Sequence, residues 1–275
     1  MRALFVLFLL SLPATGTAQL RILDGPINDQ ILVLVDAPEA NSRVHGCRAG
    51  HITWQDADGL VRLPIPPACD AQLFPLADRL LVNHIDRRLQ IVDARTGIPE
   101  VEWAGVTDGR VSPDGGSVVF IRAQARPSGL VGDAPVQVVI AEADGTSERT
   151  VITAPLLFSP VWTPDGQGLF VMGGPEHARI HRLGLDGTLT VLRGHPPIPE
   201  EYPVWADSRT WVYEARGHVW ELDLDSARIL SLHKVGRADR GPRLRGTGGV
   251  QRFVVWPEPE GPKIVLLKTL RGTAR

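Results

Sequence analysis

The residues whose types and spacing best suit chemistry are Glu176, His177 and His181 in the segment PEHARIH. In an extended strand, residues four apart point to the same side and lie about 13 Å apart, which is too far for two imidazoles to bind one metal ion directly. We therefore predict no metal site here and expect both histidines to be solvated at the rim of the fold.

A second polar group lies in RGHPPIPEEYP, a proline-rich stretch that contains His195, Glu200, Glu201 and Tyr202. The prolines and consecutive charges predict an exposed loop, and loops on a rigid scaffold often carry binding residues. Two hypotheses follow. The loop contributes to a surface that binds another protein, or His195, Glu200 and Glu201 line a site for a small ligand or an enzymatic reaction.

The familiar catalytic motifs are missing from the sequence. It contains no G-x-S-x-G elbow, no H-E-x-x-H zinc motif, no phosphate-binding glycine loop and no C-x-x-C-H haem motif. We therefore expect a protein that binds without catalysis, with no cofactor and no metal.

The elements that must carry any such site are short strands joined by tight turns. VSPDGGSVVF (111–120) and VWTPDGQGLFV (161–171) both place Pro-Asp-Gly between two apolar runs. Proline fixes φ, aspartate accepts hydrogen bonds from the backbone two residues on, and glycine supplies a positive φ. We interpret four residues as structural turn residues rather than catalytic groups: Asp114, Gly115, Asp165 and Gly166.

The acidic turn recurs about every 44 residues, which is the period of a four-stranded propeller blade. The marker positions are Asp29, Asp78, Asp114, Asp165, Asp207 and, without the acid, Gly249. Each unit contains short runs rich in Val, Leu, Ile and aromatic residues, and no stretch after the first eighteen residues has a helical period. The prediction is an all-β protein, a six-bladed β-propeller of four-stranded antiparallel blades.

We expect a single propeller domain over residues 19–275. The approximate blades are 20–66, 71–104, 108–153, 158–193, 202–235 and 241–275. Five or seven blades stay open, because LRILDG (20–25) could be the innermost strand of the first blade or the outermost strand of the last.

Residues 1–18 have the pattern of a signal peptide. Arg2 precedes an apolar run, and the small residues Gly16 and Ala18 predict cleavage after Ala18. An apolar run of about ten residues is too short to span roughly 30 Å of hydrocarbon. The expected product is periplasmic or secreted, with no stable membrane insertion.

Cys47 and Cys69 lie almost symmetrically about the turn QDADG (55–59). If the flanking runs form an antiparallel hairpin, the two cysteines lie opposite one another. An oxidising compartment then favours a structural disulfide, worth roughly 3 kcal/mol for a loop of about twenty residues.

The charge and the tryptophans bear on partners. A formal net charge of −2 provides no basic field for nucleic acid. Trp162, Trp205, Trp211 and Trp220 recur at regular positions and are expected to pack between blades. We predict that Trp103 and Trp256, which break the repeat, are exposed anchors for a protein partner of a monomeric propeller.

The longest irregular insertion is AQARPSGLVGDAPV (123–136), between the second and third strands of the third predicted blade. A loop of this length is either decoration or a functional arm, with Arg126 as its candidate contact residue.

Three segments resemble the PD40 repeat of the TolB-type, WD40-like β-propeller family: DGRVSPDGGSVVF (108–120), FSPVWTPDGQGLFV (158–171) and EYPVWADSRTWVY (201–213). The resemblance is to the propeller of that family, without its N-terminal α/β domain. It implies a periplasmic or otherwise exported six-bladed propeller that acts by binding. Our leading hypothesis is a scaffold that binds another protein of the cell envelope.

Overall fold

The computed structural model describes the strands and most of the short connections of the predicted propeller region. The described residues are 20–27, 30–36, 50–56, 59–76, 78–123, 135–173, 179–192, 196–197, 199, 203–205, 209–215, 218–226, 229–234, 243–245, 253–258 and 261–266. Every regular element among them is a strand, so the all-β prediction is confirmed. Nothing helical in these residues has the length and apolar character needed to span a membrane. The predicted signal peptide lies outside them.

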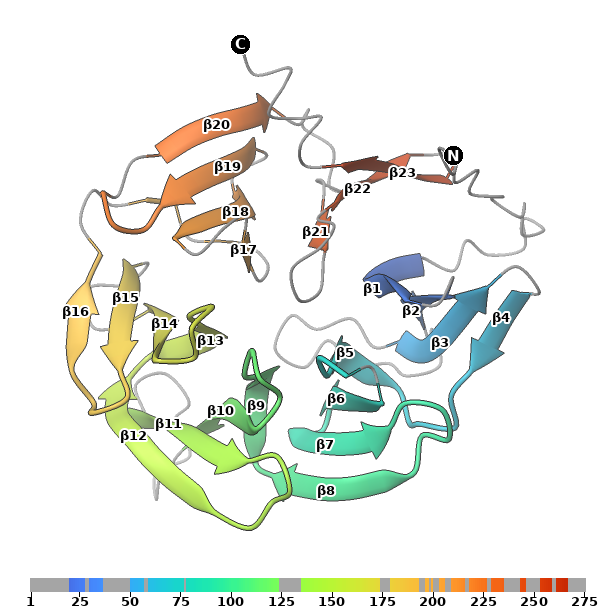
Figure 1. Cartoon of the computed structure of the whole chain (residues 1–275), viewed down its shortest axis with the longest axis horizontal. Helices are drawn as coiled ribbons and strands as arrows, with labels where there is room; N and C mark the ends of the chain where they lie inside the picture. The colour runs from blue at the N-terminus through green and yellow to red at the C-terminus, as the bar shows by residue number, and fades with distance from the viewer. Residues whose placement is uncertain are drawn as a thin grey trace.

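The strands form antiparallel sheets that stand around a common axis, with β5, β9, β13 and β17 nearest the middle (Figure 1). An eight-stranded sheet contains β1 (Leu20–Ile27), β2 (Gln30–Asp36), β3 (Gly50–Asp56), β4 (Gly59–Arg62), β5 (Ala68–Leu73), β6 (Arg79–His84), β7 (Arg88–Asp93) and β8 (Pro99–Ala104). Its two halves, β1–β4 and β5–β8, are joined by the single residue pair Gly50 and Ala68.

Three four-stranded sheets follow along the chain. They contain β9 (Val106–Val111), β10 (Ser117–Ala123), β11 (Pro135–Glu142) and β12 (Glu148–Pro155); β13 (Leu157–Trp162), β14 (Gly168–Gly173), β15 (Arg179–Gly184) and β16 (Leu189–Val191); and β17 (Val204–Trp205), β18 (Thr210–Ala215), β19 (His218–Asp223) and β20 (Ile229–Lys234). The last described sheet has three strands, β21 (Arg243–Arg245), β22 (Phe253–Glu258) and β23 (Gly261–Leu266).

The structure shows the path of two segments that the sequence analysis discussed, LRILDG and the hairpin around QDADG. β1 pairs with β2, so LRILDG belongs to the first strand of the first sheet and does not complete the last. β3 and β4 form the hairpin predicted around QDADG, with Trp54 opposite Val61. Cys69, in β5, is disulfide-bonded. Cys47 lies outside the described residues, so the pairing of the two cysteines stays a prediction.

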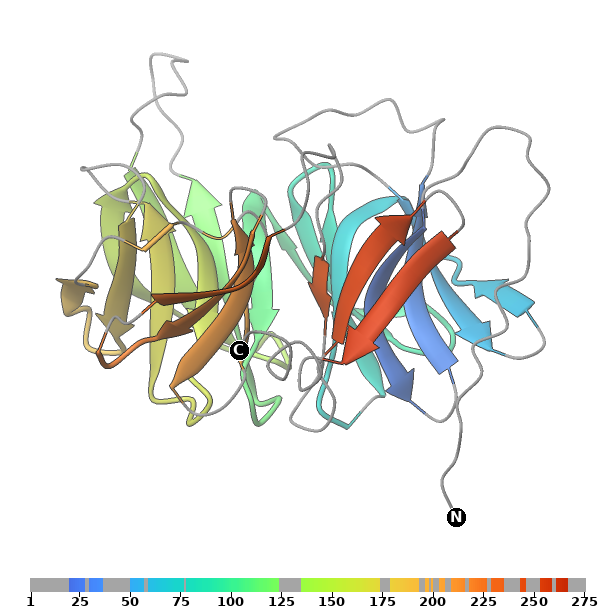
Figure 2. The same ribbon diagram turned by 90° about the horizontal axis from the view of Figure 1, so that it is seen from above.

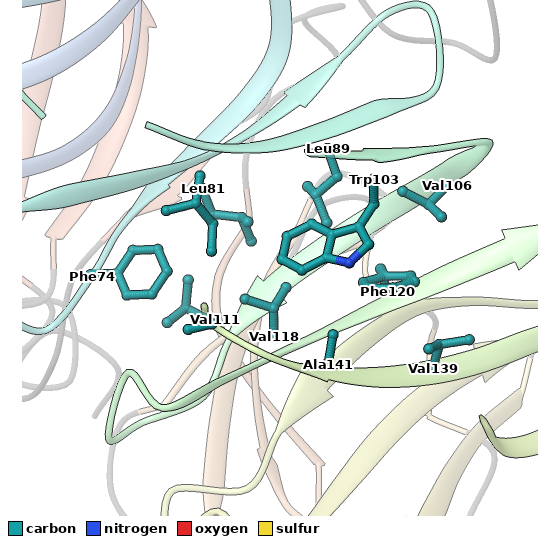
Figure 3. Packing of buried hydrophobic residues seen from close by; sticks show 12 residues of the cluster. Phe74, Leu81, Leu89, Trp103, Val106, Val111, Val118, Phe120, Val139 and Ala141 are labelled. Atoms are coloured by element: carbon teal, nitrogen blue, oxygen red, sulfur yellow. The ribbon is translucent and has the colours of Figure 1, made fainter. Parts of the chain in front are cut away.

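The hydrophobic core lies between successive sheets. One cluster joins β1–β4 to β5–β8, a second joins β5–β8 to the β9–β12 sheet, and a third joins that sheet to β13–β16. In the second cluster Trp103 is 5% exposed, and its ring centroid lies 5.5 Å from that of Phe120 (Figure 3). The prediction that Trp103 is an exposed anchor is therefore wrong, because its side chain projects from β8 toward the next sheet.

The Pro-Asp-Gly turns have the geometry that the sequence predicts. The Ser112 hydroxyl donates to Asp114 Oδ1 at 2.6 Å, and the same oxygen accepts the Gly116 N–H. Thr163 and Gln167 donate to Asp165 in the same way. The φ angles of Gly115 and Gly166 are 76° and 69°.

The predicted burial of the regular tryptophans holds for two side chains that the structure describes, while one histidine differs from its prediction. Trp162 and Trp211 are both buried.

His181 is buried as well, and its Nε2–H donates to the Gly173 carbonyl at 2.7 Å. The expectation of a solvated rim is wrong for His181, because its ring satisfies a backbone carbonyl inside the sheet. His177 lies outside the described residues.

Candidate binding face

Because the strands of each sheet are antiparallel, the connections between them alternate between two ends of the ring (Figure 2). We call one end the turn face; it carries the Pro-Asp-Gly turns 112–116 and 163–167 and the turns 143–147 and 185–188. We call the other end the crossover face. It carries the β6–β7 turn (85–87) and the links at Gly105 and Leu156, through which the chain passes from one sheet to the next.

Backbone strain is distributed unequally between the two faces. At the turn face, every described residue with a positive φ is glycine. Of the four described non-glycine residues with a positive φ, Arg87 at 62° and Leu156 at 57° lie in connections at the crossover face, and Asp108 at 57° and Ser159 at 47° lie in the halves of β9 and β13 nearest to that face. Such conformations are uncommon for residues with a Cβ and persist only where the surroundings impose them. The crossover face is therefore where the fold stores strain.

Two of these strained residues lie in bulges of the innermost strands. The register of β9 against β10 shifts next to Asp108, and that of β13 against β14 shifts next to Ser159. Bulges re-aim side chains and end regular pairing. The Ser159 N–H donates to Asp108 Oδ2 at 3.3 Å, so the carboxylate of one sheet reaches the backbone of the next.

The inner edge of β9 is covered by side chains from neighbouring sheets. Asn83 Oδ1 accepts the Gly109 N–H at 2.8 Å, and Gln72 Oε1 accepts the Val111 N–H at 3.0 Å. From the other side, Trp162 Nε1–H donates to the Arg110 carbonyl at 3.1 Å. Open strand edges invite pairing with another chain. With these groups satisfied, a ligand near the axis would meet side chains rather than an open strand edge.

An ion pair spans the boundary between the β5–β8 half-sheet and the β9–β12 sheet. Arg110 Nη2 lies 2.8 Å from Asp70 Oδ2, with the two side chains 11% and 35% exposed. Arg110 also donates to the Gly109 carbonyl. The pair therefore locks two adjacent innermost strands together.

A ladder of polar side chains crosses β6, β7 and β8 beside this pair. His84 Nε2–H donates to Gln90 Oε1 at 2.7 Å, and Gln90 donates in turn to Glu102. Arg88 pairs with both Glu102 and Asp86. Burial lowers the pKa of His84, while the hydrogen bond that Arg88 donates to Asp86 raises the pKa of Arg88. The ladder thus runs from a buried imidazole to exposed charges.

The rest of the sequence-predicted site stays untested. Arg126, His195, Glu200, Glu201 and Tyr202 lie outside the described residues. Ala123, the last residue of β10, and Pro135, the first residue of β11, lie at the crossover face, and residues 124–134 of the predicted arm lie outside the described residues. The backbone of Trp256 lies in β22, and its side chain lies outside the described part of the chain.

Sequence reasoning missed Asp70, Asp108, Arg110 and Phe158. A signal was present, because Asp70 and Asp108 both stand three residues before the end of an innermost strand. Aligning the strands that precede the turns, rather than the turns alone, would have brought these residues together. In the described part of the chain, no group of three or more His, Cys, Asp or Glu side chains is placed to hold a metal ion.

Comparison with solved structures agrees with this architecture. A protein from Agrobacterium tumefaciens assigned as TolB superposes with a TM-score of 0.50 at 15% identity, over 72% of this chain and 79% of its own. The oligogalacturonate lyase of Vibrio parahaemolyticus superposes with a TM-score of 0.54 at 10% identity, over 86% of each chain. The chain has a TolB-like β-propeller fold. At these identities, the likeness to both propellers is one of fold.

No protein-family model matches the sequence. No curated protein matches it either.

Proposed function

We propose that this chain is an exported six-bladed propeller that binds another protein of the cell envelope through its crossover face, without catalysing a reaction. The count of six treats β1–β4 and β5–β8 as separate blades, since one residue pair joins them. A ring of sheets supplies a rigid support, and recognition is commonly grafted onto the loops of such a support.

The observation that carries this proposal is the gathering of strained non-glycine residues at one face. Each such residue costs on the order of 1 to 3 kcal/mol, and strain of this kind clusters at binding and switching sites. A ring with a purely structural role could carry glycine at the positions of these residues, just as this chain carries glycine at every described positive-φ position of the turn face. The positions are those of Arg87, Asp108, Leu156 and Ser159. Ala123 and Pro135, which flank the predicted arm in the sequence, lie at the same face.

Export supports an envelope partner. The signal pattern of residues 1–18 and the expected oxidised cysteines both point to an extracytoplasmic address. N-terminal sequencing of the protein recovered from the periplasm or the medium tests this expectation. The mature chain should begin at Gln19, and retention of residues 1–18 would contradict the assignment.

Affinity capture from envelope extract tests the scaffold function. Wild-type protein should retain a partner in stoichiometric amounts. A variant in which residues 124–134 are replaced by a short glycine linker should fold with an unchanged melting temperature and lose that partner. A variant altered at the opposite face, Asp144→Asn, is the matched control and should retain it. Failure of the wild type to retain any partner would overturn the proposal.

A second candidate function is an enzyme or small-ligand binder that uses the mouth of the central channel. Two observations favour testing it: one similar propeller is an oligogalacturonate lyase, and Asp70 and Asp108 place carboxylates at matching positions of two adjacent innermost strands. Incubation with oligogalacturonate and analysis of its chain length separates the two functions. Turnover that is lost in Asp108→Asn would favour the enzyme, and no turnover favours the scaffold.

A further inference from the structure

The innermost strands β5 and β9 carry an aspartate at the same position, but the surroundings of the two carboxylates differ. Asp70 lies three residues before the end of β5, and Asp108 lies three residues before the end of β9. Asp70 is neutralised by Arg110, which comes from the next innermost strand. The corresponding partner for Asp108 would come from β13.

Strand alignment identifies the residue that would have to supply that cation. Arg110 pairs with Val119 in β10, and Val161 holds the same register position against Phe170 in β14. Val161 is an apolar side chain and is 8% exposed. Val161 therefore offers Asp108 no charge, and the ion pairs among the described residues do not include Asp108. Its half-buried carboxylate accepts the Ser159 N–H at 3.3 Å.

The residue that precedes Ser159, the donor to this carboxylate, carries an exposed aromatic ring. The N–H that Asp108 accepts belongs to the peptide group joining Phe158 to Ser159. Phe158 is 40% exposed, and it is the one aromatic side chain among the exposed large hydrophobic residues that the structure describes. A carboxylate and an exposed aromatic ring contributed by neighbouring strands can together recognise a cationic side chain, through charge and through attraction to the ring face.

The backbone around Phe158 is shaped to hold the ring in place. A Cβ on Gly173 would lie 1.9 Å from the Leu156 carbonyl oxygen and 2.9 Å from Phe158 Cε1, so only glycine leaves room there. His181 donates to the Gly173 carbonyl and secures that residue from inside the sheet. Leu156 and Ser159, on either side of Phe158, both have a positive φ. This arrangement presents the ring at a fixed position, as an interface anchor requires.

We propose that Asp108 and Phe158 form a recognition site for an arginine or lysine side chain of a protein partner. The partner's cation takes the position beside Asp108 that Arg110 occupies beside Asp70. The inference rests on the proposed scaffold function for the identity of the ligand as part of a protein. The chemistry of the site is testable without the partner.

The direct test uses small probes and the folded mature protein at low salt. N-acetylargininamide should bind with a Kd on the order of 1 to 10 mM, as expected for a single side chain, and shift NMR signals of Asp108 and its neighbours. N-acetylcitrullinamide, which has the same shape without the charge, should bind at least tenfold more weakly. Equal binding of the two probes, or no shift near Asp108, would overturn the proposal.

Two substitutions locate the effect. Asp108→Asn should weaken binding of N-acetylargininamide about tenfold, and Phe158→Leu by a smaller factor, since cation–π attraction to phenylalanine is modest. Glu148→Gln removes the same charge from an acid already paired with Arg122 and should leave binding unchanged. If Glu148→Gln weakened binding as much as Asp108→Asn, the effect would be one of net charge and the site would be refuted.

A stability measurement tests the cation position beside Asp108 independently of any ligand. Val161→Arg places a guanidinium where Arg110 stands in the preceding sheet. Asp108→Asn should then lower the melting temperature more in the Val161→Arg background than in wild type, and Val161→Arg should no longer bind the probe. Equal effects in both backgrounds would count against the proposal. If Val161→Arg does not fold, the effect of Asp108→Asn on binding of N-acetylargininamide still tests the proposal.

A partner captured by the wild type but bound equally by Asp108→Asn would refute this inference and leave the scaffold function standing. Binding of the probe by a wild type that captures no partner would refute the scaffold function and leave the cation site standing.

Discussion

A Cβ on Gly187 would lie 2.8 Å from the carbonyl oxygen of Val151 in the preceding sheet. Val151 is the extra residue of a bulge in β12, between the paired residues Thr150 and Ile152. The β15–β16 turn therefore fits onto the bulge of the neighbouring outer strand, and Arg149 strengthens the contact by donating to the Leu185 carbonyl at 2.9 Å. Glycine is required here for two reasons: its φ is positive, and the two sheets approach each other too closely for a Cβ.

Gly187→Ala should consequently destabilise the protein more than an alanine at a positive-φ glycine with open space. Gly105, with a φ of 71° and no neighbouring atom within 4 Å of the place that a Cβ would take, is the matched control. Gly105→Ala should cost about 1 kcal/mol from backbone strain alone. Gly187→Ala should cost at least twice that, measured by urea denaturation of both variants. Equal losses would mean that Val151 moves away freely.

Each Pro-Asp-Gly turn packs against the equivalent turn of the preceding sheet in the same manner. A Cβ on Gly115 would lie 3.1 Å from Pro75 Cδ, whereas one on Gly166 would lie 3.9 Å from Pro113 Cδ. Gly166→Val should cost roughly 1 to 2 kcal/mol because valine disfavours a positive φ. Gly115→Val adds a clash with Pro75 and should lower the melting temperature further. A reversed order of the two melting temperatures would contradict this account.

Local features of the fold could be predicted from the sequence, while contacts between sheets could not. The turns at Asp114 and Asp165 and the β3–β4 hairpin depend on neighbouring residues, so short patterns identify them. The exposure predicted for Trp103 was wrong because a break in the repeat does not say toward which sheet a ring points. The Asn83–Gly109 and Asp70–Arg110 contacts join residues far apart in the chain and have no local signature.

The turn aspartates should make stability depend on pH in the acid range. The hydroxyl of Thr163 and the N–H of Gln167 lower the pKa of Asp165 below its usual 3.8. The stabilisation is therefore present above pH 3.8 and is lost as the pH falls through the lower folded-state value. Asp165→Ala should lose about 1 kcal/mol at pH 7 from its missing hydrogen bonds.

Denaturation at a series of pH values checks this prediction. The difference between wild type and Asp165→Ala should shrink as the pH falls below 3.8. Asp165→Asn, which keeps an acceptor oxygen without the charge, should lose less at pH 7. A difference that stays constant down to the acid limit would show that ionisation of Asp165 contributes nothing.

His84 should add a second pH dependence, nearer neutrality. Burial lowers the pKa of His84 below its usual 6.5, so the unfolded chain takes up a proton more readily than the folded protein does. This contribution to stability is present above pH 6.5 and declines as the pH falls through 6.5 toward the folded-state value. His84→Gln cannot titrate and keeps an amide that can donate to Gln90. Its melting temperature should fall less than that of wild type between pH 7 and pH 5, and parallel curves would refute the prediction.

The disulfide predicted between Cys47 and Cys69 should contribute through the loop it closes. Cys69 lies in β5, the first strand of the second half of the eight-stranded sheet, next to Ala68, which pairs with Gly50. Constraining a loop of this length in the unfolded chain is worth roughly 3 kcal/mol. Cys69→Ser should therefore lower the free energy of unfolding by about that amount, and dithiothreitol should lower the stability of wild type to the same level without affecting the variant. A wild type whose unfolding is insensitive to the reductant would contradict both the pairing and its structural role.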